Sequence, residues 1–160
     1  MLERIKNWFL CLRFPFLKPR NVWSGDKLDD YNYEFTWLDD IPYGWKKAFG
    51  VKLCRDLKRF IKKSDYPLSE YRVMQTKEKF GRLCWYDNGL PKGGYDVLKK
   101  YEILSEHTCI NCGTHKNVYM IDDGWLSPWC KPCWEKEKKK MKWYENKEFE
   151  DFICVTKDEQ

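Results

Sequence analysis

Cys109-Ile-Asn-Cys112-Gly113 and Cys130-Lys-Pro-Cys133 are the stretches that decide the fold of the C-terminal third of the chain. They form two Cys-x-x-Cys pairs, and residues 113–129 separate them. At this spacing two tight knuckles grip one tetrahedral ion from both ends of a β-hairpin. Thiolates suit zinc, and four protein ligands leave no open position for an activated water. The sequence therefore predicts a structural Zn²⁺ site in a zinc-ribbon-like module.

The residues between the two pairs have the pattern of a hairpin. Residues 117–121 and 125–129 are rich in apolar and aromatic side chains, and Asp122-Asp123-Gly124 between them is a turn signal. We expect strand, turn and strand here. Residues 131–147 then predict a charged helix that carries Trp134, Met141 and Tyr144.

Other interpretations of the four cysteines are unpaired structural cysteines, two disulfides, or a site in which His107 or His115 replaces one thiol. Scattered single cysteines are typical of a protein in a reducing cytoplasm, where disulfides are rare. The chain has four of them, Cys11, Cys54, Cys84 and Cys154. We therefore predict a cytoplasmic protein with reduced thiols.

Two classes of zinc enzyme do not fit this region. A nucleic-acid deaminase needs His-x-Glu with Pro-Cys-x-x-Cys, whereas here Trp129 separates Pro128 from Cys130 and no His-x-Glu exists. An HNH nuclease needs a catalytic histidine where the chain reads Asp122-Asp123. No Ser-His-Asp or Cys-His arrangement and no phosphate loop is legible either. We expect a non-catalytic protein.

The remaining chain predicts an α+β fold, a small antiparallel sheet with two helices, to which the zinc-ribbon-like module is appended. Aromatic alternation over residues 31–38 predicts a strand or an extended segment. Residues 43–63 and 95–106 have helical spacing, and residues 71–86 predict a hairpin that turns near residues 79–81. We divide the chain into an N-terminal arm (1–22), an α+β core (23–104) and the module with its charged helix (105–160).

Composition points to anionic partners. The 160 residues have a net charge of +5, and aromatics make up 18%, more rings than a small core readily holds. The partner classes this favours are a nucleotide or other anionic small molecule, nucleic acid, or a host protein, and a homo-oligomer is possible.

The first residues have a charged start followed by an apolar stretch, which raises the question of a signal peptide. Arg13 and Pro15 interrupt the stretch, and no small-residue cleavage site follows. We expect an amphipathic segment that docks on the body, with a helix lying in a membrane interface as the alternative. No apolar run approaches the ~20 residues of a membrane span.

Cations and aromatic rings lie close together on the predicted hairpin, where they could pair phosphates with charge and bases with rings. The alternatives are a solvated strand face over a core containing Phe80, Leu83 and Trp85, and a simple hydrophobic anchor at Trp45. The candidate ligand-binding residues are Lys77, Lys79, Arg82, Trp85 and Tyr86, with Trp45 and Lys46 at a helix start.

Three sequence motifs that helix or strand periodicity does not explain carry a family resemblance. They are Trp37-Leu-Asp-Asp-Ile-Pro-Tyr-Gly-Trp45; Gln75-Thr-Lys-Glu-Lys-Phe-Gly-Arg-Leu83 with Tyr86; and Tyr101-Glu-x-x-Ser105, leading into Cys109-x-x-Cys-Gly113 and Gly124-Trp125 before Cys130. Together they resemble an uncharacterised family of small proteins encoded by bacteriophages and prophages, over residues 23–133. The resemblance implies the bacterial host cytoplasm but no activity.

Our working expectation is a phage-encoded, zinc-binding accessory protein. It would bind an anionic nucleotide-type ligand and antagonise host defence by sequestering that ligand. The alternatives are a DNA- or RNA-binding zinc ribbon, which should be strongly salt-dependent, and a protein-protein inhibitor of a host factor that uses its aromatic surface.

Overall fold

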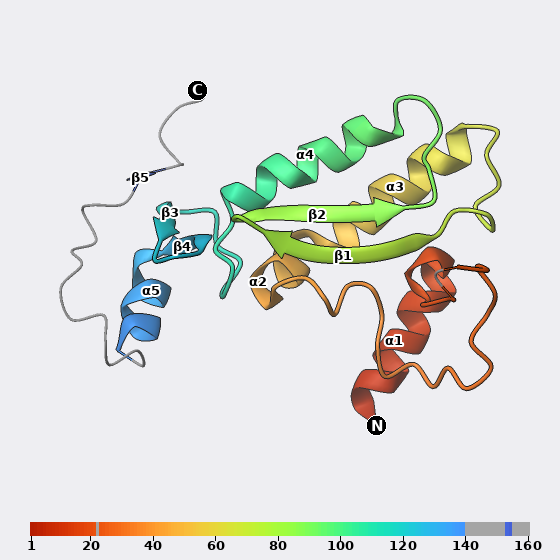
Figure 1. Ribbon diagram of the computed structural model, residues 1–160, viewed down its shortest axis with the longest axis horizontal. Coiled ribbons are helices and arrows are strands. Elements are labelled where there is room, and N and C mark those ends of the chain that lie inside the picture. The colour runs from red at the N-terminus through yellow and green to blue at the C-terminus, as the bar shows by residue number, and fades with distance from the viewer. Residues whose placement is uncertain (22, 140–152, 155–160) are drawn as a thin grey trace.

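The computed structural model describes residues 1–21, 23–139 and 153–154 (Figure 1). The chain has an α+β fold, with two small antiparallel sheets and helices that pack around the first of them. The first sheet pairs β1 with β2, and the second has the order β4-β3-β5. The predicted fold class is confirmed.

The predicted helix over residues 43–63 forms as one nearly continuous run. It comprises α2 (Tyr43–Trp45), a π-helical turn (Lys46–Gly50) and α3 (Val51–Lys63). Its apolar stripe faces the core, because the residues three to four positions apart share one side of a helix. The buried members of that stripe are Phe49, Leu53, Leu57 and Ile61.

The predicted hairpin is also present. β1 (Val73–Lys79) pairs with β2 (Arg82–Asp87), and Lys79 lies opposite Arg82. The two loop residues both have positive φ, Phe80 at 51° and Gly81 at 77°, which matches the right-handed twist of a two-residue hairpin. α4 (Gly94–Glu106) runs beside β2, where the Ser105 hydroxyl accepts the Leu83 N–H at 2.8 Å.

The N-terminal segment joins the main core. α1 (Leu2–Arg13) is followed by a 3-10 turn (Pro15–Leu17). The side chains of Phe14, Phe16 and Leu17 lie in the same buried cluster as those of α3 and β2. These three residues therefore fill the α+β core.

The prediction of a strand or an extended segment over residues 31–38 is wrong, because no strand forms there and the segment contains a bend at residues 33–34 and a turn at residues 37–38. Tyr33 has a φ of 64°, which an extended strand does not allow. The Tyr31 hydroxyl donates to the Phe35 carbonyl at 2.5 Å, and the Thr36 N–H donates to the Asp39 carboxylate at 2.6 Å. These local bonds replace the ladder that a strand would need.

The C-terminal module follows its prediction up to the end of the described residues. β3 (Val118–Asp122) and β4 (Leu126–Cys130) form the hairpin, and α5 (Lys131–Lys138) begins directly after it. β5 (Ile153–Cys154) pairs with β3. The predicted continuation of the helix to residue 147, with Met141 and Tyr144, lies outside the described residues. Within the described residues, no helix has the length and apolar character needed to cross a bilayer.

Candidate metal centre and basic strand face

The first knuckle is built from the loop that follows α4. The Cys109 N–H donates to the Thr114 carbonyl at 2.8 Å, and the Gly113 N–H returns a bond to the Cys109 carbonyl at 3.0 Å. Gly113 has a φ of +81°, a conformation that side chains rarely adopt. The Ile110 N–H donates to the Pro128 carbonyl of β4 at 2.8 Å, which ties the knuckle to the hairpin.

The second knuckle lies where β4 passes into α5. Cys130 ends the strand with extended φ and ψ, and Cys133 lies in the first turn of the helix. Pro132, also in that turn, is well suited there because a first-turn residue needs no N–H donor. Strand end and helix start therefore direct both thiols toward the first knuckle.

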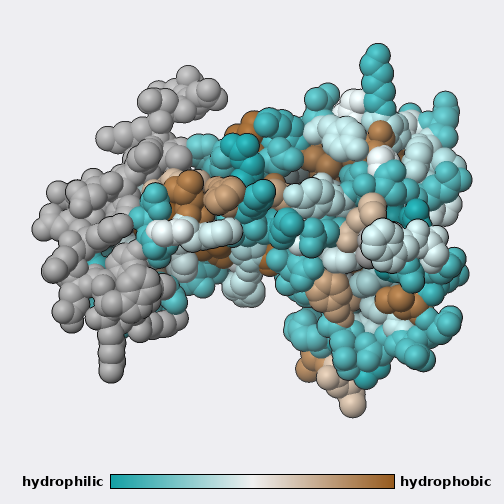
Figure 2. All heavy atoms as spheres, viewed as in Figure 1, coloured by the Kyte–Doolittle hydropathy of each residue, from teal (hydrophilic) through white to brown (hydrophobic). Residues whose placement is uncertain are grey.

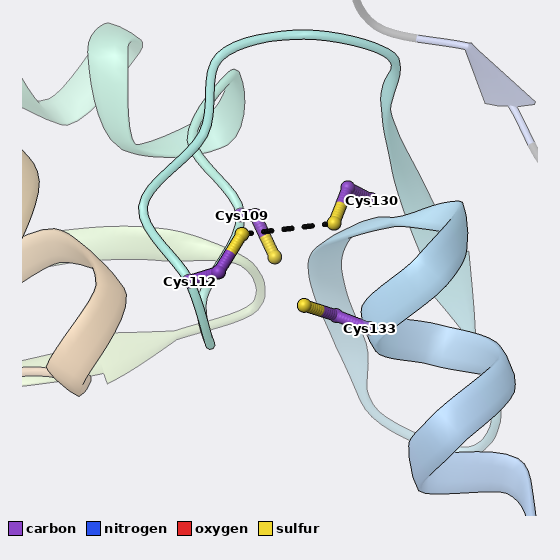
Figure 3. Close-up of side chains that lie close together, drawn as sticks. All are labelled: Cys109, Cys112, Cys130 and Cys133. Carbon is purple, nitrogen blue, oxygen red and sulfur yellow. Dashed lines mark hydrogen bonds between the residues drawn. The ribbon is translucent and has the colours of Figure 1, made fainter.

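The four sulfur atoms converge on one point, as Figure 3 shows. All four lie within 4.8 Å of one another, and the Sγ atoms of Cys112 and Cys130 are 3.7 Å apart. A tetrahedron of thiolates about 2.3 Å from a zinc ion has edges of about 3.8 Å. Cys109, Cys112, Cys130 and Cys133 are thus placed to bind a metal ion, in an arrangement consistent with zinc.

The protein environment shifts the pKa values of the clustered cysteines in different directions. Burial acts to raise the pKa of Cys109, but N–H donors from Cys112, Cys130 and Asn111 outweigh burial and lower it. Burial raises the pKa of Cys130 and of Cys133. A bound cation would supply the charge that keeps all four sulfurs ionised, since metal binding displaces the thiol protons.

The metal site forms most of the interior of the module. Its buried cluster consists of Cys109, Val118 and Cys130, with Cys112 and Cys133 packed against it. Trp134 is also buried, and its ring centroid lies 5.9 Å from that of Trp129. Because so small an apolar core stabilises little, a metal ion bound by the four cysteines would add to the stability of this unit.

Helix α2 docks directly on the first knuckle, a contact that sequence reasoning missed. The Gly44 N–H donates to the Ile110 carbonyl at 2.9 Å, and the Trp45 indole N–H donates to the Thr108 carbonyl at 2.9 Å. A Cβ on Gly44 would lie 2.2 Å from the Cys109 carbonyl oxygen. The Tyr-Gly-Trp sequence was the available signal, since a glycine inside a helix often marks a close backbone approach.

The structure divides the candidate ligand residues between two faces of the hairpin. Paired residues of an antiparallel ladder share a face, so Lys77, Lys79 and Arg82 lie with Tyr86 on the outer face. Trp85 is on the opposite face and is 7% exposed. The prediction that Trp85 contacts a ligand is therefore wrong: its ring is part of the core, and its N–H donates to the Tyr71 hydroxyl at 3.0 Å.

The predicted site at the helix start is also wrong for Trp45, which is fully buried against the module and the core. Lys46 is partly exposed but pairs with the Asp39 carboxylate, so its charge is already balanced. The alternative that placed Phe80 in the core is wrong too, because Phe80 lies at the hairpin tip and is 56% exposed. Phe80 is one of the two loop residues of the turn, and a loop residue belongs to neither face of the strands. Its position next to Gly81 was the sequence signal that this alternative overlooked.

The outer face of β1–β2 keeps uncompensated positive charge. Arg82 forms a forked pair with Glu106 of α4, and this pairing raises its pKa. Among the described residues, Lys77 and Lys79 have no carboxylate within ion-pair distance. The Lys77 ammonium lies 5.1 Å from the Tyr86 ring centroid. In Figure 2 hydrophilic side chains cover the middle of the molecule, where Figure 1 places the hairpin.

Neither histidine joins the sulfur cluster. His107 follows α4 as its C-cap, and His115 contacts the Thr108 hydroxyl through Nδ1 at 3.0 Å. In the part of the chain that the structure describes, the four cysteines are the group of three or more potential ligands that could hold a metal ion.

The candidate sites are inferred from the arrangement of the residues in the structure. Comparisons of the chain with protein-family models, with curated proteins and with solved structures gave no match. The resemblance to bacteriophage and prophage proteins therefore stays a prediction. The four convergent thiols and the basic outer face of the hairpin are the features from which a function is inferred.

Proposed function

We propose that this is a non-catalytic, zinc-binding protein that binds phosphate-bearing ligands on the outer face of β1–β2. Zinc is the metal we assign, because four cysteine ligands at this spacing favour a closed, structural zinc site. The observation that carries the binding function is the in-register grouping of Lys77, Lys79 and Arg82 beside the exposed Tyr86 ring.

The open shape of this face favours a strand of nucleic acid over an enclosed nucleotide. Trp45 and Trp85 are buried, so they cannot stack on the two sides of a base. Lys77 donates to the Gln75 side-chain carbonyl at 3.0 Å, but neither Lys77 nor Lys79 forms an ion pair among the described residues. One exposed ring beside two such lysines suits a base that stacks on Tyr86 while neighbouring phosphates contact the lysines. We therefore rank single-stranded DNA or RNA first and a free nucleotide second.

The test measures binding of a fluorescent single-stranded oligonucleotide by anisotropy across a range of salt concentrations. We expect the wild type to bind with an affinity that falls linearly with salt on logarithmic axes. Replacing both lysines, Lys77→Gln with Lys79→Gln, should reduce the magnitude of that slope by about 1.4, since each phosphate contact on a single strand contributes about 0.7.

The matched control removes the same charge from another surface. Lys52→Gln with Lys62→Gln changes two exposed lysines of α3, a helix that packs against α4. This control should leave the salt slope unchanged. Equal slopes for the wild type and the Lys77/Lys79 variant would remove the strand face as the binding site.

A free nucleotide is tested by melting temperature. A nucleoside triphosphate or cyclic dinucleotide that binds the folded protein raises this temperature at saturation. A rise that disappears in the Lys77/Lys79 variant, without oligonucleotide binding, would make the nucleotide the ligand. For a protein encoded by a phage, sequestering such a ligand is how we propose that it would antagonise host defence.

A further inference from the structure

Helix α1 presents an apolar face to solvent. At about 100° per residue, the exposed apolar side chains cover an arc of about 120° on one side of the helix. Phe9 and Leu12 are each 60% exposed and Ile5 is 50% exposed. The full set of the apolar α1 face is Met1, Leu2, Ile5, Trp8, Phe9 and Leu12.

The opposite side of α1 is already used for docking on the body. Asn7 and Cys11 are buried there, and the Cys11 thiol contacts the Tyr31 hydroxyl at 3.5 Å. The helix is thus held with its apolar α1 face outward. In Figure 2 hydrophobic side chains gather at the lower end of the molecule, where Figure 1 places the N-terminal end of α1.

A groove extends this face toward the following loop. It has a volume of about 690 Å³ and lies between α1 and residues 32–33. Tyr33, with a φ of 64°, contributes its ring to the wall, and the Lys18 ammonium lies 5.4 Å from the centroid of that ring. Backbone strain of this kind persists where the surrounding structure requires it.

Basic side chains border the apolar α1 face on both sides, and two of them also form ion pairs at the surface, Arg4 with Glu34 at 3.9 Å and Lys6 with Glu3 at 2.7 Å. By helical position Arg4 lies beyond Trp8 at one border, and Lys6 and Arg13 lie beyond Leu2 at the other. All three cations are exposed. Residues 1–20 contain five basic residues and one acidic residue, so their net charge is +4, whereas the whole chain has +5.

We propose that α1 lies in the interface of an anionic lipid bilayer. An apolar arc flanked by Lys and Arg, with a tryptophan at its edge, is the arrangement of a helix that inserts its apolar side among acyl chains while its cations contact lipid phosphates. A second copy of the chain would place two such charged borders against each other, which opposes dimerisation through this face. The proposal does not depend on the strand-face function.

The test is co-sedimentation of the full chain with vesicles. One set contains equal parts of phosphatidylglycerol and phosphatidylcholine, and the other is pure phosphatidylcholine. We expect binding to the anionic vesicles that weakens with salt, and at least tenfold less partitioning for the triple variant Ile5→Ser, Phe9→Ser, Leu12→Ser. These side chains are exposed, so the variant should keep its fold by circular dichroism.

Two control variants distinguish vesicle binding through α1 from non-specific hydrophobic binding and from binding through the basic outer face of β1–β2. Tyr43→Ser, Tyr95→Ser, Ile103→Ser removes three side chains of similar exposure from other elements. The Lys77/Lys79 variant removes the other basic surface. Both should partition as the wild type does. The proposal is overturned if the wild type ignores anionic vesicles, if either control loses binding as the triple α1 variant does, or if sedimentation equilibrium shows a dimer that the α1 variant abolishes.

Discussion

At the scale of single residues, two glycines set how closely α2 approaches the metal centre. A Cβ on Gly44 would meet the Cys109 carbonyl oxygen at 2.2 Å, and a Cβ on Gly113 would meet the Gly44 carbonyl oxygen at 2.5 Å. Both obstacles are backbone atoms, which cannot rotate away as a flexible side chain can. The ligand loop and the helix are therefore held against each other through their backbones.

Gly44→Ala should destabilise the fold by at least about 2 kcal/mol, because overpacking against fixed backbone forces the helix and the knuckle apart. Gly50→Ala is the control within the same helical run, where the nearest atom to an added Cβ is 3.5 Å away. That control should be neutral or stabilising by up to about 1 kcal/mol. Urea unfolding of the two variants measures the difference, and equal stabilities would contradict the close approach.

The partly buried carboxyl of Asp87 should make the stability of the protein depend on pH. Burial raises its pKa above the ordinary 3.8, although N–H and O–H donors from Gly89, Tyr71 and Tyr95 partly offset this. The folded protein therefore holds this proton more tightly than the unfolded chain. The stability that it contributes is full below about pH 3.8 and declines as pH rises through the folded pKa.

Asp87→Asn removes this titration. Relative to the wild type, the stability of the variant should increase as pH rises through that window, as measured by unfolding midpoints at a series of pH values. Asp96→Asn changes an exposed carboxyl on α4 and serves as the comparison. A constant difference between Asp87→Asn and the wild type at every pH would show that Asp87 titrates alike in the folded and unfolded chain.

The sequence predicted the four clustered cysteines better than it predicted which side chains lie on the outer face of β1–β2. Two Cys-x-x-Cys pairs leave little freedom, because the knuckles and a tetrahedral ion fix each other. Trp85 and Tyr86, by contrast, are adjacent aromatics next to cations, and only the packing of β2 against α4 and the buried core decides which ring faces solvent. That information is tertiary, so the sequence placed both rings in the site when one of them belongs to the core.

At the scale of elements, the two hairpins meet at their tips. The Phe80 ring stacks on Trp125 with centroids 5.3 Å apart, and the Trp125 indole N–H donates to Glu78 at 2.8 Å. A Cβ on Gly81 would approach the Met120 sulfur at 2.5 Å. The tip of the basic hairpin therefore rests on the metal-binding hairpin.

A double-mutant cycle tests this contact. Phe80→Ala and Trp125→Ala should show a coupling energy of about 0.5–1 kcal/mol, because exposed stacked rings contribute modestly. Phe80→Ala combined with Tyr95→Ala, at the other end of the hairpin, should be additive. Thermal or urea unfolding supplies the four stabilities, and zero coupling for Phe80 with Trp125 would mean that the tips do not support each other.

Helices were predictable at this scale because their apolar residues recur at helical spacing. The prediction for residues 31–38 failed for a physical reason. Aromatic rings alternate along the segment, but Tyr33 has positive φ, and the Asp39 carboxylate accepts hydrogen bonds from the Thr36 N–H and hydroxyl. Side-chain bonds to nearby backbone compete with strand pairing, and periodicity does not reveal them. The sequence predicted that the N-terminal segment is amphipathic, but it did not predict that the apolar α1 face points to solvent.

At the scale of the whole molecule, the metal centre joins the C-terminal module to the α+β core. The first knuckle contacts α2, the hairpin tip contacts β1–β2, and the sulfur atoms form the interior of the module. Loss of the ion should therefore loosen the module and both of its contacts with the core.

Cys133→Ser should lower metal affinity by on the order of 100-fold or more and should lower the melting temperature, because Cys133 is one of the four converging thiols and packs against the buried cluster of the module. Cys84→Ser changes a cysteine outside the cluster and should keep one bound metal per chain. Native mass spectrometry gives the stoichiometry, and a chelator should reproduce the Cys133→Ser melting curve in the wild type. Full metal content in Cys133→Ser would remove this residue from the ligand set.

The tip-to-tip contact of the two hairpins has a consequence for the cell that makes this protein. The lysines that we assign to phosphate binding lie on the β1–β2 hairpin, whose tip rests on the β3–β4 hairpin beside the four cysteines. If zinc fills this site as we propose, chains made in a zinc-depleted cell would lack the ion that supports the β3–β4 hairpin, and their affinity for an anionic ligand would fall. Metal supply would then set the fraction of chains competent to act.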